Sequence, residues 1–157
     1  IALAKHIPSC RVIAVDISPD ALAIAKENAV TQKVADRIDF VQGDLLSAIS
    51  AGQRLAYLVS NPPYISDDEW AQVEPNVKDY EPHLALRGGV DGLRDLRKLI
   101  EQAPAYLQMP GQLVLEFASS QKQAMLQLAQ QNPGLTNAHI LADHEALPRI
   151  LVADKAG

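Results

Sequence analysis

Short apolar runs alternate with helical patterns of apolar and polar positions along the chain. Residues 11–16 are rich in β-branched side chains and predict a strand, and residues 19–30 place apolar side chains on one face of a helix. Ser18 and Pro19 are typical of a helix N-cap and first turn. We expect Pro104 to kink or end a later helix. Further strands are predicted at residues 38–41, 55–59 and 112–117, helices at 93–103 and 121–131, and apolar stretches around 139–141 and 150–152.

This alternation predicts an α/β fold in which a parallel sheet is covered by helices on both faces. Ligands of such sheets bind outside the carboxyl ends of the strands. Asp16, Asp44 and Asn61 each come directly after a predicted strand, so we expect them along one edge of the sheet. An acidic or amide residue at a strand end is also common as a cap or turn former. That alternative stays open for Asp16 and Asp44 taken singly.

Composition narrows the class of protein. The chain has 157 residues, is 48% apolar and carries a formal charge of -5, which fits one folded domain spanning residues 1–157. It contains no apolar run of about 18 residues and no signal-peptide pattern, so we expect no membrane partner. Its one cysteine, Cys10, excludes a disulfide framework within the chain and favours the cytoplasm. Acidity without a basic stripe makes nucleic acid an unlikely partner. Because the chain begins with Ile1, we expect it to be a piece of a longer protein.

The stretch "VSNPPYIS" ends an apolar run with residues that leave hydrogen-bond acceptors exposed. Pro62 and Pro63 have no backbone N–H and hold φ nearly fixed. The Asn61 side chain and the Pro62 carbonyl therefore offer two acceptors that match the two donors of a planar NH2 group, and Tyr64 could cover that group by stacking. A rigid turn without chemistry is the alternative. The sequence thus predicts that Asn61 and Pro62 position a nitrogen nucleophile.

Carboxylates after the earlier strands suit a nucleoside. Asp16 is placed to accept hydrogen bonds from a ribose diol, as in nucleotide-binding sheets. Asp44 could accept from the exocyclic amine of an adenine while Leu45 supplies a backbone N–H. Both roles need a glycine-rich turn, which this sequence does not contain.

Several motifs together resemble a known family. "AVDISPDALAIAKENA", "QGDLL" and "NPPY" are similar to class I S-adenosylmethionine-dependent methyltransferases. The stretch from "NPPYISDDEW" to "VKDYEPHLALRGGVDGLRDLRKLI", with the ending "PRILVADKA", more closely resembles the release-factor glutamine methyltransferases, the HemK or PrmC family. The resemblance covers nearly the whole chain.

The resemblance implies an activity and a set of site residues. The family transfers a methyl group from S-adenosyl-L-methionine to the glutamine side-chain amide in the GGQ motif of class I peptide chain release factors. It implies that Asn61 and Pro62 are catalytic. The cofactor-binding residues would be Asp16, Ile17, Asp44 and Leu45, and the substrate-binding residues Asn61, Pro62, Pro63 and Tyr64. It implies no metal, and the four histidines lack metal-ligand spacing.

The sequence also departs from the family pattern. The family's first strand and glycine-rich turn should precede "IALA", and that strand belongs between the strands ending at Asp16 and Asn61. The N-terminal helical domain that docks the substrate is absent too, so we expect this chain alone to bind the cofactor poorly. Phe117 and Ala118 stand where the family usually has an apolar residue and a glycine.

Other residues receive structural expectations. Glu81 and Pro82 resemble part of a loop that shapes the pocket. The acidic run at residues 67–69 is expected in a solvated loop or at a helix cap, and Trp70 as a loop anchor. Two alternative functions remain: methylation of an adenine or guanine exocyclic amine in DNA or rRNA, and a degenerate domain without catalysis that binds a protein partner.

Overall fold

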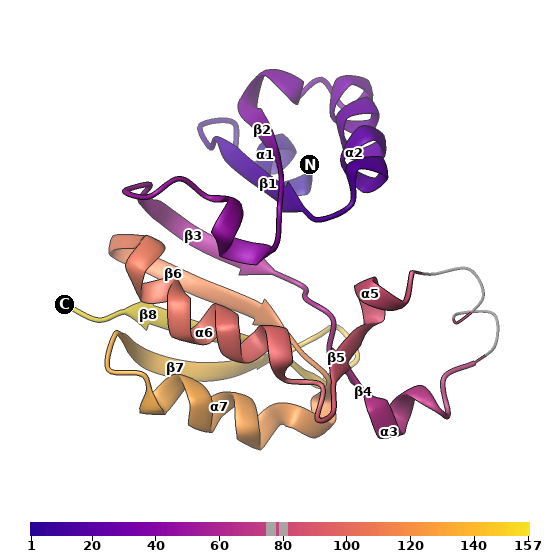
Figure 1. The fold of residues 1–157 in the computed structure, drawn as a ribbon. Coiled ribbons are helices and arrows are strands. Elements are labelled where there is room, and N and C mark those ends of the chain that lie inside the picture. Colours follow the sequence, from indigo (N-terminus) through magenta and orange to yellow (C-terminus); the bar gives the residue numbers. More distant parts are fainter. Residues whose placement is uncertain (75–77, 79–81) are drawn as a thin grey trace. The chain divides into compact units, whose positions relative to one another are not determined.

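The computed structural model describes residues 1–74, 78 and 82–157 (Figure 1). The chain divides into two compact units, Ile1–Gln53 and Arg54–Gly157. That the whole chain acts as one catalytic domain stays a prediction.

The N-terminal unit builds a two-stranded parallel sheet with helices. Its elements are α1 (Ala2–His6), β1 (Val12–Asp16), α2 (Pro19–Thr31), the 3-10 turn η1 (Ala35–Arg37), β2 (Ile38–Gln42) and the 3-10 turn η2 (Leu45–Ala48). Ser18 is the N-cap of α2, as predicted, and its hydroxyl accepts a hydrogen bond from the Ala21 N–H at 3.2 Å. The predicted strand–helix–strand order is therefore confirmed here.

Small and branched apolar side chains form the core of this unit. Ala4, Ala29, Val34 and Ile38 are buried together. Val12, Ala14 and Phe40 pack against them. Ala4 lies in α1 and Ala29 in α2, so both helices contribute to this core, and the buried residues of α2, Leu22 and Ala29, lie on its predicted apolar face.

The C-terminal unit is built on a four-stranded mixed sheet. Its elements are β3 (Leu55–Ser60), β4 (Ile65–Ser66), α3 (Asp67–Trp70), α5 (His83–Leu86), β5 (Arg87–Gly89), α6 (Arg94–Tyr106), β6 (Leu107–Glu116), the 3-10 turn η3 (Ser119–Gln121), α7 (Lys122–Gln131), β7 (Leu135–Ala142) and β8 (Pro148–Lys155). The strand order is β3-β6-β8-β7, and β4 pairs with β5 separately.

The expectation of an entirely parallel sheet was wrong for the last strands. β3 and β6 pair in parallel, but β8 runs antiparallel to both β6 and β7. The reason is the short connection between β7 and β8, which leaves no room for the crossover that a parallel pair needs. Among the described residues, β1 pairs only with β2, and β3 only with β6. A further strand between β1 and β3 stays a prediction.

Two helices cover one face of the four-stranded sheet. α6 packs on β6, α7 packs on β7 and β8, and the two helices lie side by side (Figure 1). Leu113, Leu115 and Leu151 are fully buried beneath them. Tyr57 and Val59 alternate with the buried Leu58 along β3, and both are exposed.

Pro104 does not end α6, so that half of the expectation was wrong, and a kink at Pro104 stays a prediction. The helix continues to Tyr106. A proline cannot donate to the carbonyl four residues before it. That carbonyl belongs to Ile100, and it accepts a hydrogen bond from the Asn132 side chain at 2.8 Å instead. A distant amide thus satisfies the group that the proline leaves without a helical partner.

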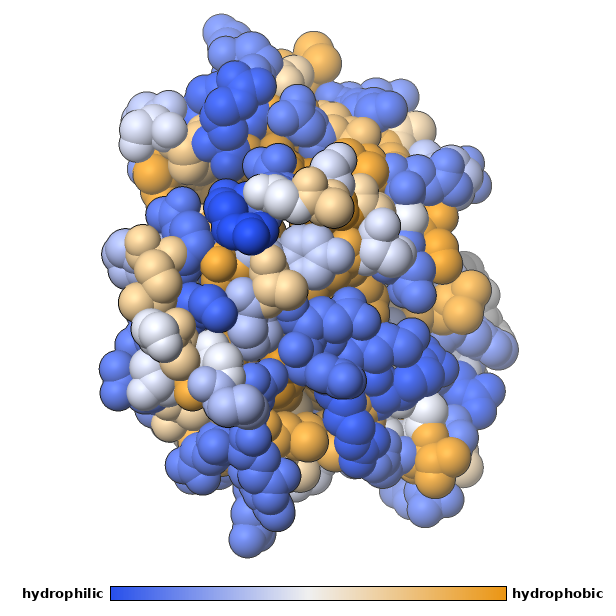
Figure 2. All heavy atoms as spheres, turned by 60° about the vertical axis from the view of Figure 1, so that its left-hand side comes forward, coloured by the Kyte–Doolittle hydropathy of each residue, from blue (hydrophilic) through white to orange (hydrophobic). Residues whose placement is uncertain are grey.

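Hydrophilic side chains occupy most of the surface visible in Figure 2, with apolar side chains interspersed. No helix among the described residues has the length and apolar character that a membrane crossing requires.

Candidate functional site

The predicted nucleoside-binding residues lie at the carboxyl end of β1 and β2. The Gly43 N–H donates to the Asp16 carbonyl at 3.0 Å, so the two strand ends stay side by side. Asp16 is exposed, and its Oδ1 accepts from the Ser18 N–H at 2.8 Å. Ile17, the next residue, is 55% exposed. A carboxylate and an apolar side chain are therefore presented together at this edge.

Asp44 and Leu45 follow β2 at the same edge. The Asp44 carbonyl accepts from the backbone N–H and the hydroxyl of Ser47, which holds the turn. Leu45 has a φ of 48°, in the left-handed region that side chains with a Cβ seldom adopt. Backbone strain of this kind often accompanies binding sites. The fold of the N-terminal unit brings Asp16, Ile17, Asp44 and Leu45 together, as the sequence predicted.

The segment Asn61–Tyr64 connects β3 to β4 in the C-terminal unit. Asn61 is exposed directly after the strand, and Pro62 is buried. Ser60 pairs with Leu115 before the segment, and Ile65 pairs with Arg87 after it. Both ends of the segment are therefore anchored in strands, and its first side chain reaches solvent.

Tyr64 is held by a carboxylate from β6. Its hydroxyl donates to Glu116 Oε1 at 3.4 Å. Burial raises the pKa of the Tyr64 phenol, and the nearby Glu116 carboxylate raises it further, while Arg149 lowers it. The Tyr64 phenol is thus a neutral hydrogen-bond donor, and its bond to Glu116 orients the ring. Its role in covering a substrate amide stays a prediction.

A tight glycine turn packs against this segment. Gly92 has a φ of 72°, and a Cβ there would collide with the Tyr64 carbonyl oxygen and with the Gln121 side-chain nitrogen. A Cβ at Gly88 would lie 2.7 Å from the Pro63 carbonyl oxygen. Only glycine permits such approaches of backbone to backbone. Gly88 and Gly92 therefore allow the backbone to pack closely against Pro63 and Tyr64. The sequence motifs alone did not predict this role.

Gln121 is the main residue that sequence reasoning missed. It is buried, and its Nε2 donates to the Tyr64 carbonyl at 2.9 Å. Its Oε1 accepts from the Ala118 N–H at 3.1 Å. Gln121 stands three residues after Ala118, the N-cap of η3, and a glutamine at this position that reaches back to the N-cap N–H is a known capping pattern visible in the sequence. The hydrogen bond from the Ala118 N–H to Gln121 fixes the position of Ala118. Phe117, the preceding residue, is fully buried.

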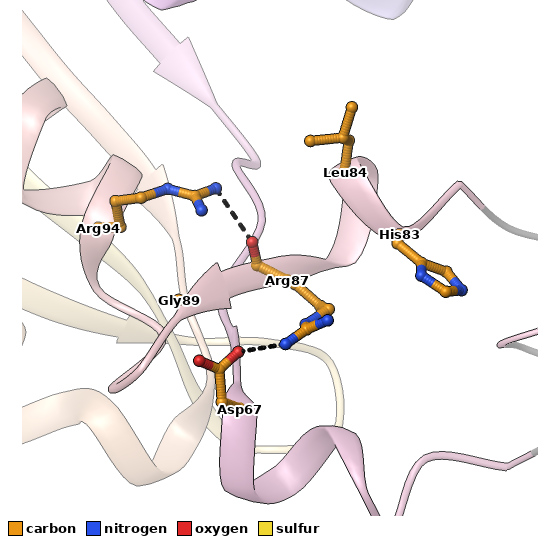
Figure 3. A pocket seen from close by; sticks show the side chains of 6 residues that line it. All are labelled: Asp67, His83, Leu84, Arg87, Gly89 and Arg94. Carbon is orange, nitrogen blue, oxygen red and sulfur yellow. Dashed lines mark hydrogen bonds and ion pairs between the residues drawn. The ribbon is translucent and has the colours of Figure 1, made fainter.

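A hollow of about 290 Å³ lies beside α5 and β5 (Figure 3). It is lined by Asp67, His83, Leu84, Arg87, Gly89 and Arg94. Arg87 pairs with Asp67 at 2.7 Å, and Arg94 donates to the Arg87 carbonyl at 3.1 Å. The cations that line the hollow are thus held by partners within the protein.

The acidic run after the segment forms the short helix α3. Ser66 is the N-cap of α3, and the Glu69 carboxylate accepts a hydrogen bond from the Ser66 N–H. The alternative of a helix cap was therefore correct. Trp70 stacks edge-on against His83 with ring centroids 4.9 Å apart and lies 5.5 Å from the Arg87 guanidinium carbon. It joins α3 to α5 and β5, as a loop anchor does.

Some predicted features are left without a test. Glu81 lies outside the described residues, and Pro82 precedes α5 as an exposed residue. Within residues 1–74, 78 and 82–157, no group of three His, Cys, Asp or Glu side chains could hold a metal ion. The nucleoside-binding residues belong to one unit and Asn61–Tyr64 to the other, so their approach to each other stays a prediction.

Comparison with known proteins places these features in context. A family model described as "Methyltransferase domain" matches residues 1–79. A release factor glutamine methyltransferase of Rhodopirellula baltica is 36% identical over 99% of this chain and 53% of its own length. A protein of the same name from Moorella thermoacetica is 40% identical over 98% of this chain and 53% of its own length. The chain therefore spans about half the length of the curated relatives it matches.

Solved structures match the fold at low identity. TrmN from Thermus thermophilus has a TM-score of 0.64 and 21% identity, covering 99% of this chain and 39% of that one. A methyltransferase from Pyrococcus furiosus has a TM-score of 0.69 and 14% identity, covering 99% of this chain and 68% of that one. The predicted α/β fold of the class I methyltransferase type is confirmed.

Proposed function

The chain belongs to the methyltransferase domain family, and from this we propose that its protein methylates the GGQ glutamine of class I peptide chain release factors. The methyl donor is S-adenosyl-L-methionine, and the acceptor is the side-chain amide nitrogen. The reaction takes place in the cytoplasm, where release factors act, and nucleic acid is not the substrate.

The observation that carries this proposal is the extent of similarity to one kind of protein. The relatives named release factor glutamine methyltransferase are 33% to 40% identical over 98% to 100% of this chain. The identity extends through the C-terminal unit, beyond the residues that the general family model matches. Similarity over that unit supports a particular acceptor as well as a methyltransferase fold.

The edge of the N-terminal unit fits the adenosine part of the cofactor. Asp16 presents an exposed carboxylate that is held by Ser18 at the end of β1, which suits the two hydroxyls of a ribose. The exposed Ile17 side chain offers an apolar surface for the adenine ring. Asp44 and Leu45 would hold the exocyclic amine and a ring nitrogen of that base.

The segment Asn61–Tyr64 fits a primary carboxamide. Asn61 Oδ1 and the Pro62 carbonyl would accept the two N–H bonds of the substrate glutamine. An amide nitrogen is a weak nucleophile because its lone pair is delocalised. Holding both N–H bonds orients the nitrogen, and the two acceptors stabilise positive charge as it develops.

When bound, S-adenosylmethionine supplies the methyl group: its carbon–sulfur bond breaks as the carbon bonds to the amide nitrogen, which then releases one proton to water. The protein side chains contribute position and electrostatics. Tyr64, kept neutral and directed by Glu116, would cover one face of the amide.

The experiment measures transfer of a radioactive methyl group by the full encoded protein that contains these residues. The acceptors are a class I release factor and the same factor with the GGQ glutamine replaced by alanine. We expect label on the first and none on the second. Asn61→Ala should lower transfer at least a hundredfold and leave the Kd for S-adenosylmethionine, measured by calorimetry, within about twofold.

The matched control is Asn28→Ala, which removes an exposed carboxamide from α2 and should leave transfer unchanged. Label on an adenine-containing oligonucleotide or on rRNA, with none on the release factor, would select the alternative acceptor. No binding of S-adenosylmethionine by the full encoded protein would select the degenerate domain. Undiminished transfer by Asn61→Ala would refute the role given to Asn61.

A further inference from the structure

Gln121 connects three separate parts of the C-terminal unit. Its Nε2 donates to the carbonyl of Tyr64 at 2.9 Å and to the carbonyl of Asp91 at 3.3 Å. Its Oε1 accepts from the Ala118 N–H at 3.1 Å. The residue is only 8% exposed. Replacing this buried carboxamide should be destabilising, because a side chain without the amide donors leaves the carbonyls of Tyr64 and Asp91 without their hydrogen bonds.

The carbonyl that Gln121 holds belongs to the segment that contains the candidate amide site. Tyr64 comes two residues after Pro62, whose carbonyl is one of the two proposed acceptors. Pro63 lies between them, and its ring holds φ near -65°. The connection from one carbonyl to the other is therefore stiff, and a displacement of the Tyr64 carbonyl is passed on to that of Pro62.

Gly92 confines the same carbonyl from the glycine turn. The Gly92 backbone approaches the Tyr64 carbonyl oxygen so closely that a Cβ would collide with it. The Gln121 amide also contacts the turn through the Asp91 carbonyl. The Tyr64 carbonyl is thus held by the Gln121 donor and packed closely against the Gly92 backbone.

We propose that Gln121 is a positioning residue for the amide site at Asn61 and Pro62. The inference rests on the proposed function, because it names a residue that sets the geometry of that site. Gln121 acts through Tyr64 and Pro63, and it does not itself contact the substrate. Its effect should therefore fall on the rate of transfer rather than on cofactor binding.

The test is Gln121→Glu in the full encoded protein. Glutamate keeps an oxygen that accepts from the Ala118 N–H, but it turns a carboxylate oxygen toward the carbonyls of Tyr64 and Asp91 in place of the amide donors. The matched control is Gln127→Glu, which makes the same change on an exposed position of α7.

We expect kcat for methylation of the release factor to fall tenfold to a hundredfold in Gln121→Glu, as for a small misplacement of reacting groups. The KM for S-adenosylmethionine should stay within about twofold, and Gln127→Glu should match the unchanged protein. A lower melting temperature with an unchanged kcat of the folded protein would overturn the proposal. Should Gln121→Glu fail to fold, Gln121→Met, which removes the donors without adding charge, is measured in the same way.

A second measurement separates this proposal from the proposed function. The NMR signals of the Asn61 side-chain amide and of the Ile65 backbone amide report the segment without any turnover. Both should shift in Gln121→Glu and not in Gln127→Glu. If the unchanged protein transfers no methyl group to a release factor, the proposed function fails, and the NMR shifts still decide the inference. Unshifted Asn61 signals would overturn it.

Discussion

Replacing Gly92 by alanine should destabilise the C-terminal unit more than the same replacement at Gly89 in the same turn. Both residues have positive φ, 72° at Gly92 and 89° at Gly89. A side chain at either position therefore costs roughly 1 to 2 kcal/mol for the left-handed backbone. The two positions differ in the space around them.

The space around each Cβ sets the expected difference. At Gly89 a Cβ would meet the Arg94 side chain at 3.5 Å, an ordinary contact. At Gly92 it would collide with the Tyr64 carbonyl and the Gln121 amide, and the first of these is backbone that cannot rotate away. Over-packing of this kind costs about 1 to 3 kcal/mol more. We expect Gly92→Ala to lose about 2 to 5 kcal/mol in total, and Gly89→Ala about 1 to 2.

The assay is denaturant unfolding followed by the fluorescence of Trp70. This residue is the only tryptophan in the chain and lies in α3, so its emission reports the C-terminal unit. The free energies of unfolding of the two variants should differ by about 1 to 3 kcal/mol, which is roughly 2 to 12 °C in Tm. Equal free energies for Gly92→Ala and Gly89→Ala would refute the reasoning, because they would mean that the turn relaxes to admit the methyl group.

Two further predictions concern pH. The N–H groups of Leu147 and Glu145 donate to Asp143 and hold the pKa of its carboxyl below 3.8, with Arg149 adding to the effect. Because the folded pKa is depressed, this stabilisation is present above about pH 4 and is lost as the pH falls through the folded pKa. The melting temperatures of the unchanged protein and of Asp143→Ala, plotted against pH, should therefore converge in acid. A constant difference between the two plots would contradict this prediction. The Tyr64 pKa is raised above 10, so its neutral form stabilises the fold below pH 10 and the gain is lost as the pH rises through the folded value. The ionisation of the tyrosines can be followed by absorbance as the pH is raised. Compared with the unchanged protein, Tyr64→Phe should lose absorbance change above pH 10. A loss of absorbance change below pH 10 would contradict the prediction.

Local chemistry explains what could be predicted from the sequence. Ser18 caps α2 because a hydroxyl beside a first-turn proline acts on the nearest backbone N–H groups. β1 and β3 form where β-branched and apolar side chains cluster, at the predicted residues. The acceptors of Asn61 and Pro62 follow from covalent structure alone, since two prolines lack N–H groups. Each of these features depends on residues a few positions apart.

Pairing between distant residues decided the rest. The Ile100 carbonyl, freed by Pro104, finds Asn132 at a separation of 32 positions. Gln121 reaches the Tyr64 carbonyl across 57 positions, and Glu116 reaches the Tyr64 hydroxyl across 52. No periodicity within a helix or strand specifies such partners, because they meet only after β3 and β6 pair and α7 packs on the sheet. The sequence therefore predicts which atoms of Asn61 and Pro62 could bind an amide, whereas only the tertiary structure shows the buried Gln121 that we propose holds those atoms in place.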